Sequence, residues 1–266
     1  MDLQLANKTA IVTGGSKGIG KAIARALAEE GVDLALFARN PETLNAAAAE
    51  IAAATRRRVV AIPADTGNTE SVDAAVAKAA AELGRIDILV NCAAQPGGAP
   101  PRPGIEHLPD ENFLEQMNVK VLGYTRCARA VTPHMKANGW GRIINISGLA
   151  ARQTGNPIGS MRNVAVQALT KNLADELGPF GINVTCIHPG LTWTEFMEET
   201  MARQAASRGE TLEHARDRMA QGNTVHQIIT AEDIAALTAF LASPRSIAVN
   251  GESIAAGGGA PKAIYY

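Results

Sequence analysis

Residues 9–20 read TAIVTGGSKGIG, and this stretch decides the fold of the chain. Its first part, Thr9–Thr13, is rich in β-branched residues and predicts a short buried strand. The glycines that follow without a spacer predict a tight turn. Ile19, Ile23 and Leu27 then recur every four residues, which is typical of one face of a helix. The stretch therefore predicts a strand, a glycine turn and a helix in direct succession.

The glycine turn predicts a binding site for a dinucleotide pyrophosphate. Backbone N–H groups at the start of the helix face the space beyond the strand, where the helix dipole also stabilises an anion. Gly14, Gly18 and Gly20 suit this position, because the turn needs a positive φ and a Cβ would hold the phosphates away. Since strand, turn and helix are in register, the pattern is more specific than a lone glycine motif.

Outward from this unit, short β-branched runs alternate with longer stretches of helical spacing. This alternation is typical of a parallel sheet with helices on both faces. Further strands are expected at Asp33–Ala38, Val59–Pro63, Ile86–Asn91, Arg142–Ile146, Asn183–Ile187 and Ser253–Ala255. Long helices are expected at about Asp110–Ala137 and Ser160–Leu177. Residues 1–266 are therefore predicted to form a single α/β domain of three layers, with a Rossmann-type doubly wound parallel sheet.

Two segments interrupt the alternation, and both leave the edge of the sheet where ligands of such folds bind. Residues 95–109, QPGGAPPRPGIEHLP, are so rich in proline and glycine that they predict an irregular loop. Residues of about 191–228 predict a charged, methionine-bearing helical excursion. We expect both segments to cover a substrate pocket. Thr230-Ala-Glu-Asp233 then predicts a capping box that opens the last helix.

Composition and charge point to a small-molecule substrate. The formal net charge is −1, so the chain lacks the basic footprint expected for nucleic acid or an anionic membrane. The first residues, MDLQLANKTAIVTGG, lack the pattern of a signal peptide, and no apolar run is long enough to span a membrane. We therefore expect a cytoplasmic protein. The three cysteines, Cys92, Cys127 and Cys186, have no paired spacing, so no metal site is expected.

Motifs at the ends of the other strands extend the pattern of the glycine turn. They are Asp65 after the third strand, Asn91-Cys-Ala-Ala94 after the fourth, Asn118 in the following helix, and Pro189-Gly190 after the sixth. Together with Thr13-Gly-x-x-x-Gly18-x-Gly20, this spacing resembles the short-chain dehydrogenase/reductase family over nearly the whole chain. The resemblance implies a nicotinamide dinucleotide as cofactor, and a homodimer or homotetramer built on the fourth and fifth helices.

The resemblance also implies how the dinucleotide is held. In the family, the residue at Asp65 contacts adenine, the segment at Asn91–Ala94 lines the adenosine ribose, and Pro189–Thr194 holds the carboxamide end. The usual sequence after the fourth strand is Asn-Asn-Ala-Gly, so Cys92 and Ala94 are departures. The expected cofactor-binding residues are Gly14, Ser16, Lys17, Gly18, Ile19, Gly20, Arg39, Asp65, Asn91, Ala93, Pro189, Gly190 and Thr194.

The charge near the second strand selects between the two nicotinamide cofactors. A carboxylate at the end of this strand would accept a hydrogen bond from the ribose 2′-OH and select NAD. This site holds Phe37-Ala38, Arg39 follows, and Lys17 adds a second cation in the glycine turn. Both charges suit a 2′-phosphate, so we expect NADP(H) to be preferred over NAD(H). The alternative is that Lys17 and Arg39 are solvated surface residues.

The resemblance breaks at the catalytic residues. The family's chemistry uses an Asn, a Ser, a Tyr and a Lys, and Asn118 matches the first of these. Aligning Arg142–Gly148 with the family places Gly148 at the serine position. The Tyr-x-x-x-Lys positions fall on Gly159 and Asn163. Asn118 is therefore the catalytic residue that the resemblance leaves in place.

Neither frame supplies a tyrosine as general acid. Counting forward from the fifth strand gives Met161 and Ala165, and the tyrosines of the chain are Tyr124, Tyr265 and Tyr266. Ser160, Arg162 and Asn163 begin the fifth helix beside the expected nicotinamide and are the replacement candidates. Arg162 would act as an electrostatic donor to a developing oxyanion. The alternative for Ser160 is a helix N-cap.

These observations favour an NADP(H)-dependent oxidoreductase of the short-chain dehydrogenase/reductase type with a non-standard active centre. Its substrate would be an unidentified small carbonyl or hydroxyl compound. The retained Asn118 and the helical excursion favour this hypothesis. The missing Tyr and Lys favour two alternatives, namely a non-catalytic nucleotide-binding sensor or scaffold, and a lyase or isomerase that keeps the nucleotide as a fixed electrostatic element.

Overall fold

A seven-stranded parallel sheet forms the centre of the protein. The structure, a computed structural model, describes residues 1–95 and 105–261. The strands lie in the order β3-β2-β1-β4-β5-β6-β9, and every neighbouring pair is parallel. Their bounds are β1 Thr9–Thr13, β2 Asp33–Ala38, β3 Val59–Pro63, β4 Ile88–Asn91, β5 Gly141–Ile146, β6 Ile182–Pro189 and β9 Ser253–Ala256. Because the order reverses between β1 and β4, the sheet has a topological switch point there, where such folds bind their ligands.

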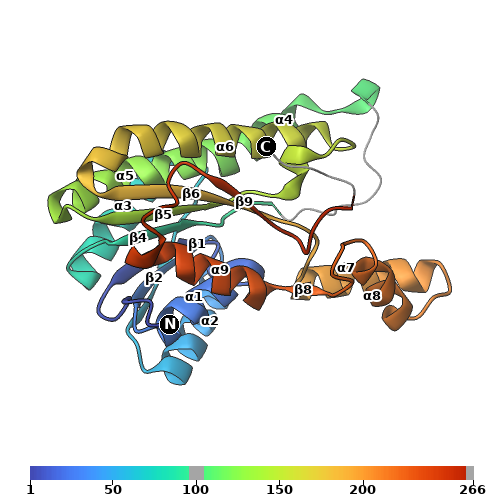
Figure 1. Ribbon diagram of the computed structural model, residues 1–266, viewed down its shortest axis with the longest axis horizontal. Coiled ribbons are helices and arrows are strands. Elements are labelled where there is room, and N and C mark those ends of the chain that lie inside the picture. The colour runs from blue at the N-terminus through green and yellow to red at the C-terminus, as the bar shows by residue number, and fades with distance from the viewer. Residues whose placement is uncertain (96–104, 262–266) are drawn as a thin grey trace.

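Helices cover both faces of this sheet and confirm the three layers that the sequence predicts (Figure 1). One layer holds α1 (Gly18–Glu29), α2 (Pro41–Thr55) and α9 (Ala231–Ala242). The other holds α3 (Thr69–Leu83), α4 (Asp110–Gln116), α5 (Gly123–Asn138) and α6 (Pro157–Leu177). No helix among the described residues is long and apolar enough to cross a lipid bilayer.

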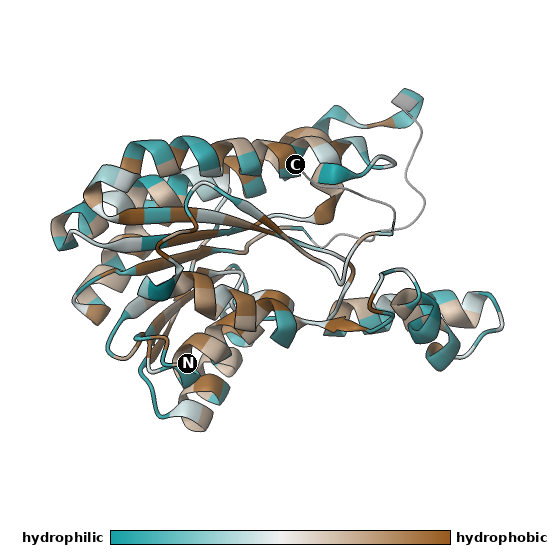
Figure 2. Cartoon of the chain, in the orientation of Figure 1, coloured by the Kyte–Doolittle hydropathy of each residue, from teal (hydrophilic) through white to brown (hydrophobic). Residues whose placement is uncertain are grey.

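The two faces of the central strands fill two separate apolar cores. In β1, Val12 packs into the core beneath α1 and α9, whereas Ile11 packs into the core beneath α3 and α5. In β2, Leu36 and Phe37 divide between the two cores in the same way. Figure 2 shows the resulting apolar strands and the more polar outer helices. Strands buried on both faces are nearly continuous apolar runs, which is why the sequence pattern identifies them.

The helical excursion consists of α7 (Glu195–Ser207) and α8 (Leu212–Ala220), which project from one end of the molecule (Figure 1). A two-stranded sheet joins its ends, because β7 (Thr192–Trp193) pairs with β8 (Ile229–Thr230). Thr230 then begins α9 through the capping box with Asp233 that the sequence predicts. The second segment expected to cover the pocket is the loop at residues 95–109, and its residues 96–104 lie outside the described residues.

The long helix expected at Asp110–Ala137 is continuous but not uniform. α4 passes into a π-helical turn at Met117–Leu122, and this turn passes into α5. A π turn bonds each residue to the fifth along the chain, so it changes which side chains face inward compared with an α-helix. The turn contains no glycine or proline that would signal it in the sequence.

α6 begins at Pro157 rather than at Ser160. Asn156 is the N-cap, because its Oδ1 accepts a hydrogen bond from the N–H of Gly159 at 3.0 Å. The interpretation of Ser160 as the N-cap is therefore wrong. The Ser160 hydroxyl instead donates to the carbonyl of Gln153 at 2.8 Å. The Asn-Pro pair was the better signal, since asparagine is favoured at the N-cap and proline at the first helical position.

Candidate active site

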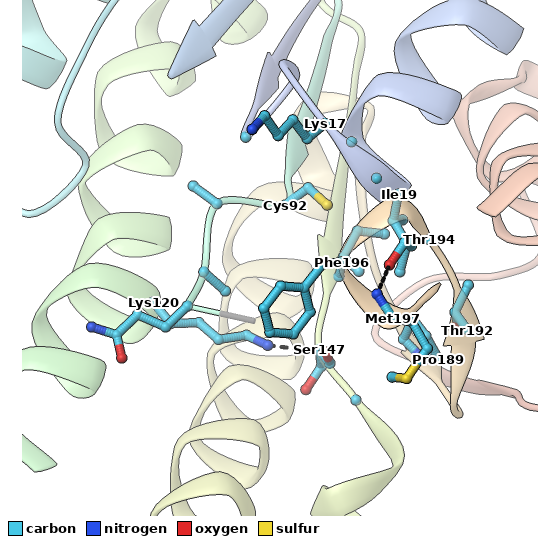
Figure 3. A pocket seen from close by; sticks show the side chains of 18 of the residues that line it. Lys17, Ile19, Cys92, Lys120, Ser147, Pro189, Thr192, Thr194, Phe196 and Met197 are labelled. Carbon is cyan, nitrogen blue, oxygen red and sulfur yellow. Dashed lines mark hydrogen bonds between the residues drawn. The ribbon is translucent and has the colours of Figure 1, made fainter. Parts of the chain in front are cut away.

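A cavity of about 950 Å³ opens at the carboxyl edge of the sheet. It extends from the glycine turn after β1, past the ends of β4 and β5, to α6 and the two helices of the excursion. In Figure 3, Lys120 lies on the left of the view, Thr192 and Met197 lie on the right, and the ring of Phe196 is seen between them. The cavity therefore connects the glycine turn with a second compartment beside α6.

Neighbouring strands hold the glycine turn in a fixed shape. The N–H groups of Gly14 and Gly15 donate to the carbonyl of Phe37 at 2.7 and 3.3 Å. Gly14 and Gly18 have positive φ angles of 69° and 53°. A Cβ on Gly20 would collide with the carbonyl of Gly14, so α1 can pack this closely only without a side chain there. Because its glycines carry no side chains, the turn lets a phosphate approach the backbone closely.

A carboxylate lies against the start of α1. The N–H of Gly18 donates to Oε2 of Glu195, in the first turn of α7, at 3.2 Å. Free N–H groups and the helix dipole make this end of α1 attractive to anions. An anionic oxygen therefore fits against the glycine turn, as an oxygen of a dinucleotide phosphate would.

All but one of the expected cofactor-binding residues line the cavity. They are Gly14, Ser16, Lys17, Gly18, Ile19, Gly20, Arg39, Asp65, Ala93, Pro189, Gly190 and Thr194. Asn91 is the exception, because its side chain lies inside the sheet and its Nδ2 donates to Oδ1 of Asn145 at 2.9 Å. The side chain of Asn91 thus supports the sheet beneath the loop after β4, and a contact of Asn91 with the cofactor stays a prediction. Lys17 and Arg39 are both exposed at the cavity.

The structure separates Asn118 from the other catalytic candidates. Its Nδ2 donates to the carbonyl of Gly67 at 3.1 Å, and its Oδ1 accepts from the guanidinium of Arg126 at 2.8 Å. Asn118 is not among the described residues that line the cavity, whereas Val119 and Lys120 are. The π turn explains the difference, because it directs a different side chain inward from the one that an α-helical count suggests. The side chain of Asn118 therefore faces the loop after β3, and its expected place beside the other catalytic candidates is corrected.

Lys120 is the candidate that the sequence reasoning missed. Lys120 is 3% exposed, and its Nζ donates to the carbonyl of Ser147 at 2.9 Å (Figure 3). Nζ also donates to Oδ1 of Asn163 at 2.8 Å. Burial, followed by the nearby charge of Arg162, lowers the pKa of Lys120 to about 7. Its ammonium therefore exchanges a proton in the neutral pH range, which an exposed lysine does not do.

Arg162, which the sequence suggested, lies in the same wall of the cavity. It is 7% exposed, and its Nε has no hydrogen-bond partner among the described residues. Burial lowers the pKa of its guanidinium. No carboxylate in the described part of the chain forms an ion pair with Arg162 or Lys120. The two side chains thus bring uncompensated positive charge to this compartment.

Other titratable groups nearby are poorly suited to acid–base chemistry at neutral pH. Burial raises the pKa of the Cys92 thiol to about 12. Burial, followed by the charge of Arg152, lowers the pKa of His188 to about 4. The Tyr124 hydroxyl donates to the carbonyl of Ile146 at 2.8 Å, and burial raises the pKa of Tyr124 well above its ordinary value. Tyr265 and Tyr266 lie outside the described residues.

The positions aligned with the family's Ser, Tyr and Lys lie in one wall. Gly148, Gly159 and Asn163 all line the cavity, whereas Ser160, also described, does not. A Cβ on Gly148 would lie 3.0 Å from Nδ2 of Asn163. A Cβ on Gly159 would collide with the side-chain amide of Asn156, the N-cap of α6. A side chain at position 159 therefore requires the amide of Asn156 to shift.

Known proteins share both the sequence pattern and the architecture. The sequence model of the short chain dehydrogenase family matches residues 8–205. The short-chain reductase protein NovJ of Streptomyces niveus is 37% identical over 95% of this chain and 93% of that protein. The NADPH-dependent reductase BacG of Bacillus subtilis (strain 168) is 32% identical over 98% of this chain and 100% of that protein.

The fold match to a solved structure extends over nearly the whole chain. The crystal structure of L-sorbose reductase from Gluconobacter frateurii, complexed with NADPH and L-sorbose, superposes with a TM-score of 0.93 and 30% sequence identity. The match covers 99% of this chain and 100% of that chain, so it includes the sheet, the glycine turn and the helical excursion. Sequence and structure together show that the chain belongs to the short-chain dehydrogenase/reductase family.

Proposed function

We propose that this protein is an NADPH-dependent reductase of small carbonyl compounds in which Lys120 supplies the proton. The observation that carries the proposal is the buried ammonium of Lys120, in the wall of the cavity that begins at the glycine turn. A lysine with an ordinary pKa holds its proton too firmly to be an efficient acid at neutral pH. At Lys120 the pKa of about 7 removes this obstacle.

The glycine turn and two cations would hold the cofactor. The N–H groups at the start of α1 would bind the pyrophosphate after Glu195 leaves Gly18. Lys17 and Arg39 line the cavity and would bind the 2′-phosphate that distinguishes NADPH from NADH. Two similar proteins support this choice, since BacG is NADPH-dependent and the L-sorbose reductase complex contains NADPH. When bound, the dinucleotide supplies a hydride to the substrate carbon.

Lys120 would give the proton that the reduction needs. Ser147 and Asn163 accept two of the three N–H bonds of its ammonium, which leaves the third for the substrate oxygen. In the reduction the C=O bond becomes a C–O single bond, and the oxygen takes its proton from Nζ. Lys120 is then neutral, the form that burial favours, and it takes a new proton from solvent before the next turnover.

The pH dependence of the rate should follow Lys120. The titratable groups that interact with it are Arg162, Tyr124, Cys92, Cys186 and His188. Burial and Arg162 lower the pKa of Lys120, and the two cysteines act in the opposite direction. His188 has a pKa of about 4 and therefore stays neutral in the working range. The rate of reduction should fall as pH rises past about 7, because Lys120 then loses its proton.

Replacing Lys120 tests the proposal. Lys120→Met should lower kcat for NADPH oxidation with activated ketones by about 10²- to 10⁴-fold, the usual loss when a positioned acid is removed. The affinity for NADPH should not change, because the glycine turn is untouched. Lys171→Met, which replaces an exposed lysine on α6, is the matched control. Turnover is followed by the loss of NADPH absorbance across the pH range.

Unchanged turnover in Lys120→Met would overturn the role of Lys120. Tight binding of NADPH by the wild type, with no turnover of any ketone, would instead favour the non-catalytic sensor or scaffold. Conversion of substrate without net oxidation of NADPH would favour the lyase or isomerase.

A further inference from the structure

Two buried cations face the cavity without a counter-ion in the described part of the chain. Lys120 is 3% exposed and Arg162 is 7% exposed. The ion pairs among the described residues involve neither of them. Burying an unpaired charge is costly, so buried charges are normally paired within the protein or with a ligand. The two cations therefore call for an anion that the described residues do not supply.

Arg162 has the free donors that such an anion needs. Its Nε is buried and has no hydrogen-bond partner in residues 1–95 and 105–261, and its side chain lines the cavity. A guanidinium presents N–H donors in one plane, and this fork matches the two oxygens of a carboxylate. Tyr124 lies nearby but does not neutralise Arg162, because its hydroxyl donates to Ile146 and burial keeps it in the neutral form.

The carboxylates that line the cavity are engaged elsewhere or lie on the excursion. Glu195 accepts from the N–H of Gly18 at the start of α1. Asp65 accepts from the N–H of Gly67 at 2.9 Å, in the loop after β3. Glu199 belongs to α7. None of them forms an ion pair with Arg162 or Lys120 in the described part of the chain.

We propose that Arg162 binds a carboxylate of the substrate, which makes small oxo acids the substrate class of this protein. Lys120 then faces the carbonyl oxygen, and the substrate charge offsets the two buried cations. Phe196, Met197 and Met219 line the cavity from α7 and α8 and suit an apolar body attached to the acid. The inference that the substrate carries an oxo group rests on the proposed function, whereas the inference of a carboxylate site rests on the buried charges alone.

Binding of an unreactive acid tests this site without any turnover. Benzoate and benzamide have the same shape but differ in charge, and each is titrated by calorimetry into the protein saturated with NADP⁺. Benzoate should bind the wild type about tenfold or more tightly than benzamide, because a charge-assisted contact outweighs a neutral one. Arg162→Gln should weaken benzoate alone, and Arg162→Lys should restore part of its affinity. Arg129→Gln, which replaces an exposed arginine on α5, is the control.

Equal affinities of the wild type for benzoate and benzamide would overturn the proposal. Full benzoate affinity in Arg162→Gln would do so as well. Thermal unfolding of each variant distinguishes lost binding from lost folding. If Arg162→Gln does not fold, Arg162→Met is used as the uncharged variant in its place. If the protein prefers benzoate but oxidises no NADPH with any oxo acid, the carboxylate site stands and the proposed function is wrong. If the protein oxidises NADPH with neutral ketones but does not prefer benzoate over benzamide, the proposed function stands and the carboxylate site is wrong.

Discussion

The two halves of the cavity use positive charge in opposite ways. In the nucleotide half, Lys17 and Arg39 are exposed, and backbone N–H groups provide the fixed donors. In the half beside α6, Lys120 and Arg162 are buried. An exposed cation attracts a phosphate with little cost and in a salt-dependent way. A buried cation must find an anion or give up its proton. Under the proposed function, the first half selects the cofactor and the second responds to the charge of the substrate.

Removing the two exposed cations should have the largest effect and should break the nucleotide half. Lys17→Ala combined with Arg39→Ala should weaken NADPH binding by about 10²- to 10⁴-fold, since each charge-assisted contact contributes roughly 1.5–3 kcal/mol. NADH should bind with unchanged affinity, because it lacks the 2′-phosphate. Calorimetric titration with both nucleotides measures the difference, with Lys78→Ala on α3 as the control. An equal loss for NADH would mean that the two cations do not discriminate between the cofactors.

The second effect should appear in stability rather than in binding. Lys120→Met should raise the free energy of unfolding at pH 6 by about 1–4 kcal/mol, as when apolar groups replace buried charges. The pKa of Lys120 in the fold, about 7, lies below its ordinary value of 10.5. Between these values the unfolded chain binds more protons than the folded one, so the penalty shrinks as pH rises. The gain should therefore be complete below about pH 7 and should disappear towards pH 10.5.

Urea unfolding at several pH values measures this gain. Lys171→Met provides the control, because it removes a lysine that is exposed on α6. A Lys120→Met variant that is less stable than the wild type at pH 6 would show that the ammonium supports the fold. The contrast between the two halves would then be lost, since Lys120 would be a structural cation.

The smallest effect should come from Glu195, which faces the nucleotide half from α7. Its carboxylate accepts from Gly18 where the pyrophosphate would bind, so the two anions compete. Glu195→Gln should strengthen NADPH binding by a few fold, because an exposed charge at a helix terminus contributes about 0.3–1 kcal/mol. Glu198→Gln changes the other acid in the first turn of α7 and is the matched control. Weaker binding in Glu195→Gln would show that the carboxylate assists the nucleotide.

The nucleotide half could be predicted because its determinants are local in the sequence. The strand, the glycine turn and α1 are contiguous, and their glycines meet the backbone requirements directly. The capping box of Thr230 and Asp233 was equally local and is confirmed. Asn91 was placed correctly at the end of β4, but its side chain packs within the sheet, and the family motif alone does not show this.

The half of the cavity beside α6 depends on a change of helical pitch that the sequence does not predict. The π turn places Lys120 in the cavity wall and turns Asn118 towards Gly67 and Arg126. One signal was available, because Lys120 lies four residues before Tyr124, at the start of the buried stripe of α5. A lysine on an apolar stripe is unusual and marks either a buried charge or the end of the stripe. The partners that decide between these, Ser147 and Asn163, are distant in sequence.

The cap at the start of α6 also constrains which side chains position 159 accepts. The side chain of Asn156 occupies the space that a Cβ on Gly159 would need. A tyrosine at 159 therefore requires that the Asn156 amide shifts or that Asn156 is replaced. Replacement by alanine sacrifices a cap contribution of about 0.5–2 kcal/mol, whereas replacement by serine keeps a capping hydroxyl. The two positions are thus coupled, because the side chain at 156 sets the space that is available to a side chain at 159.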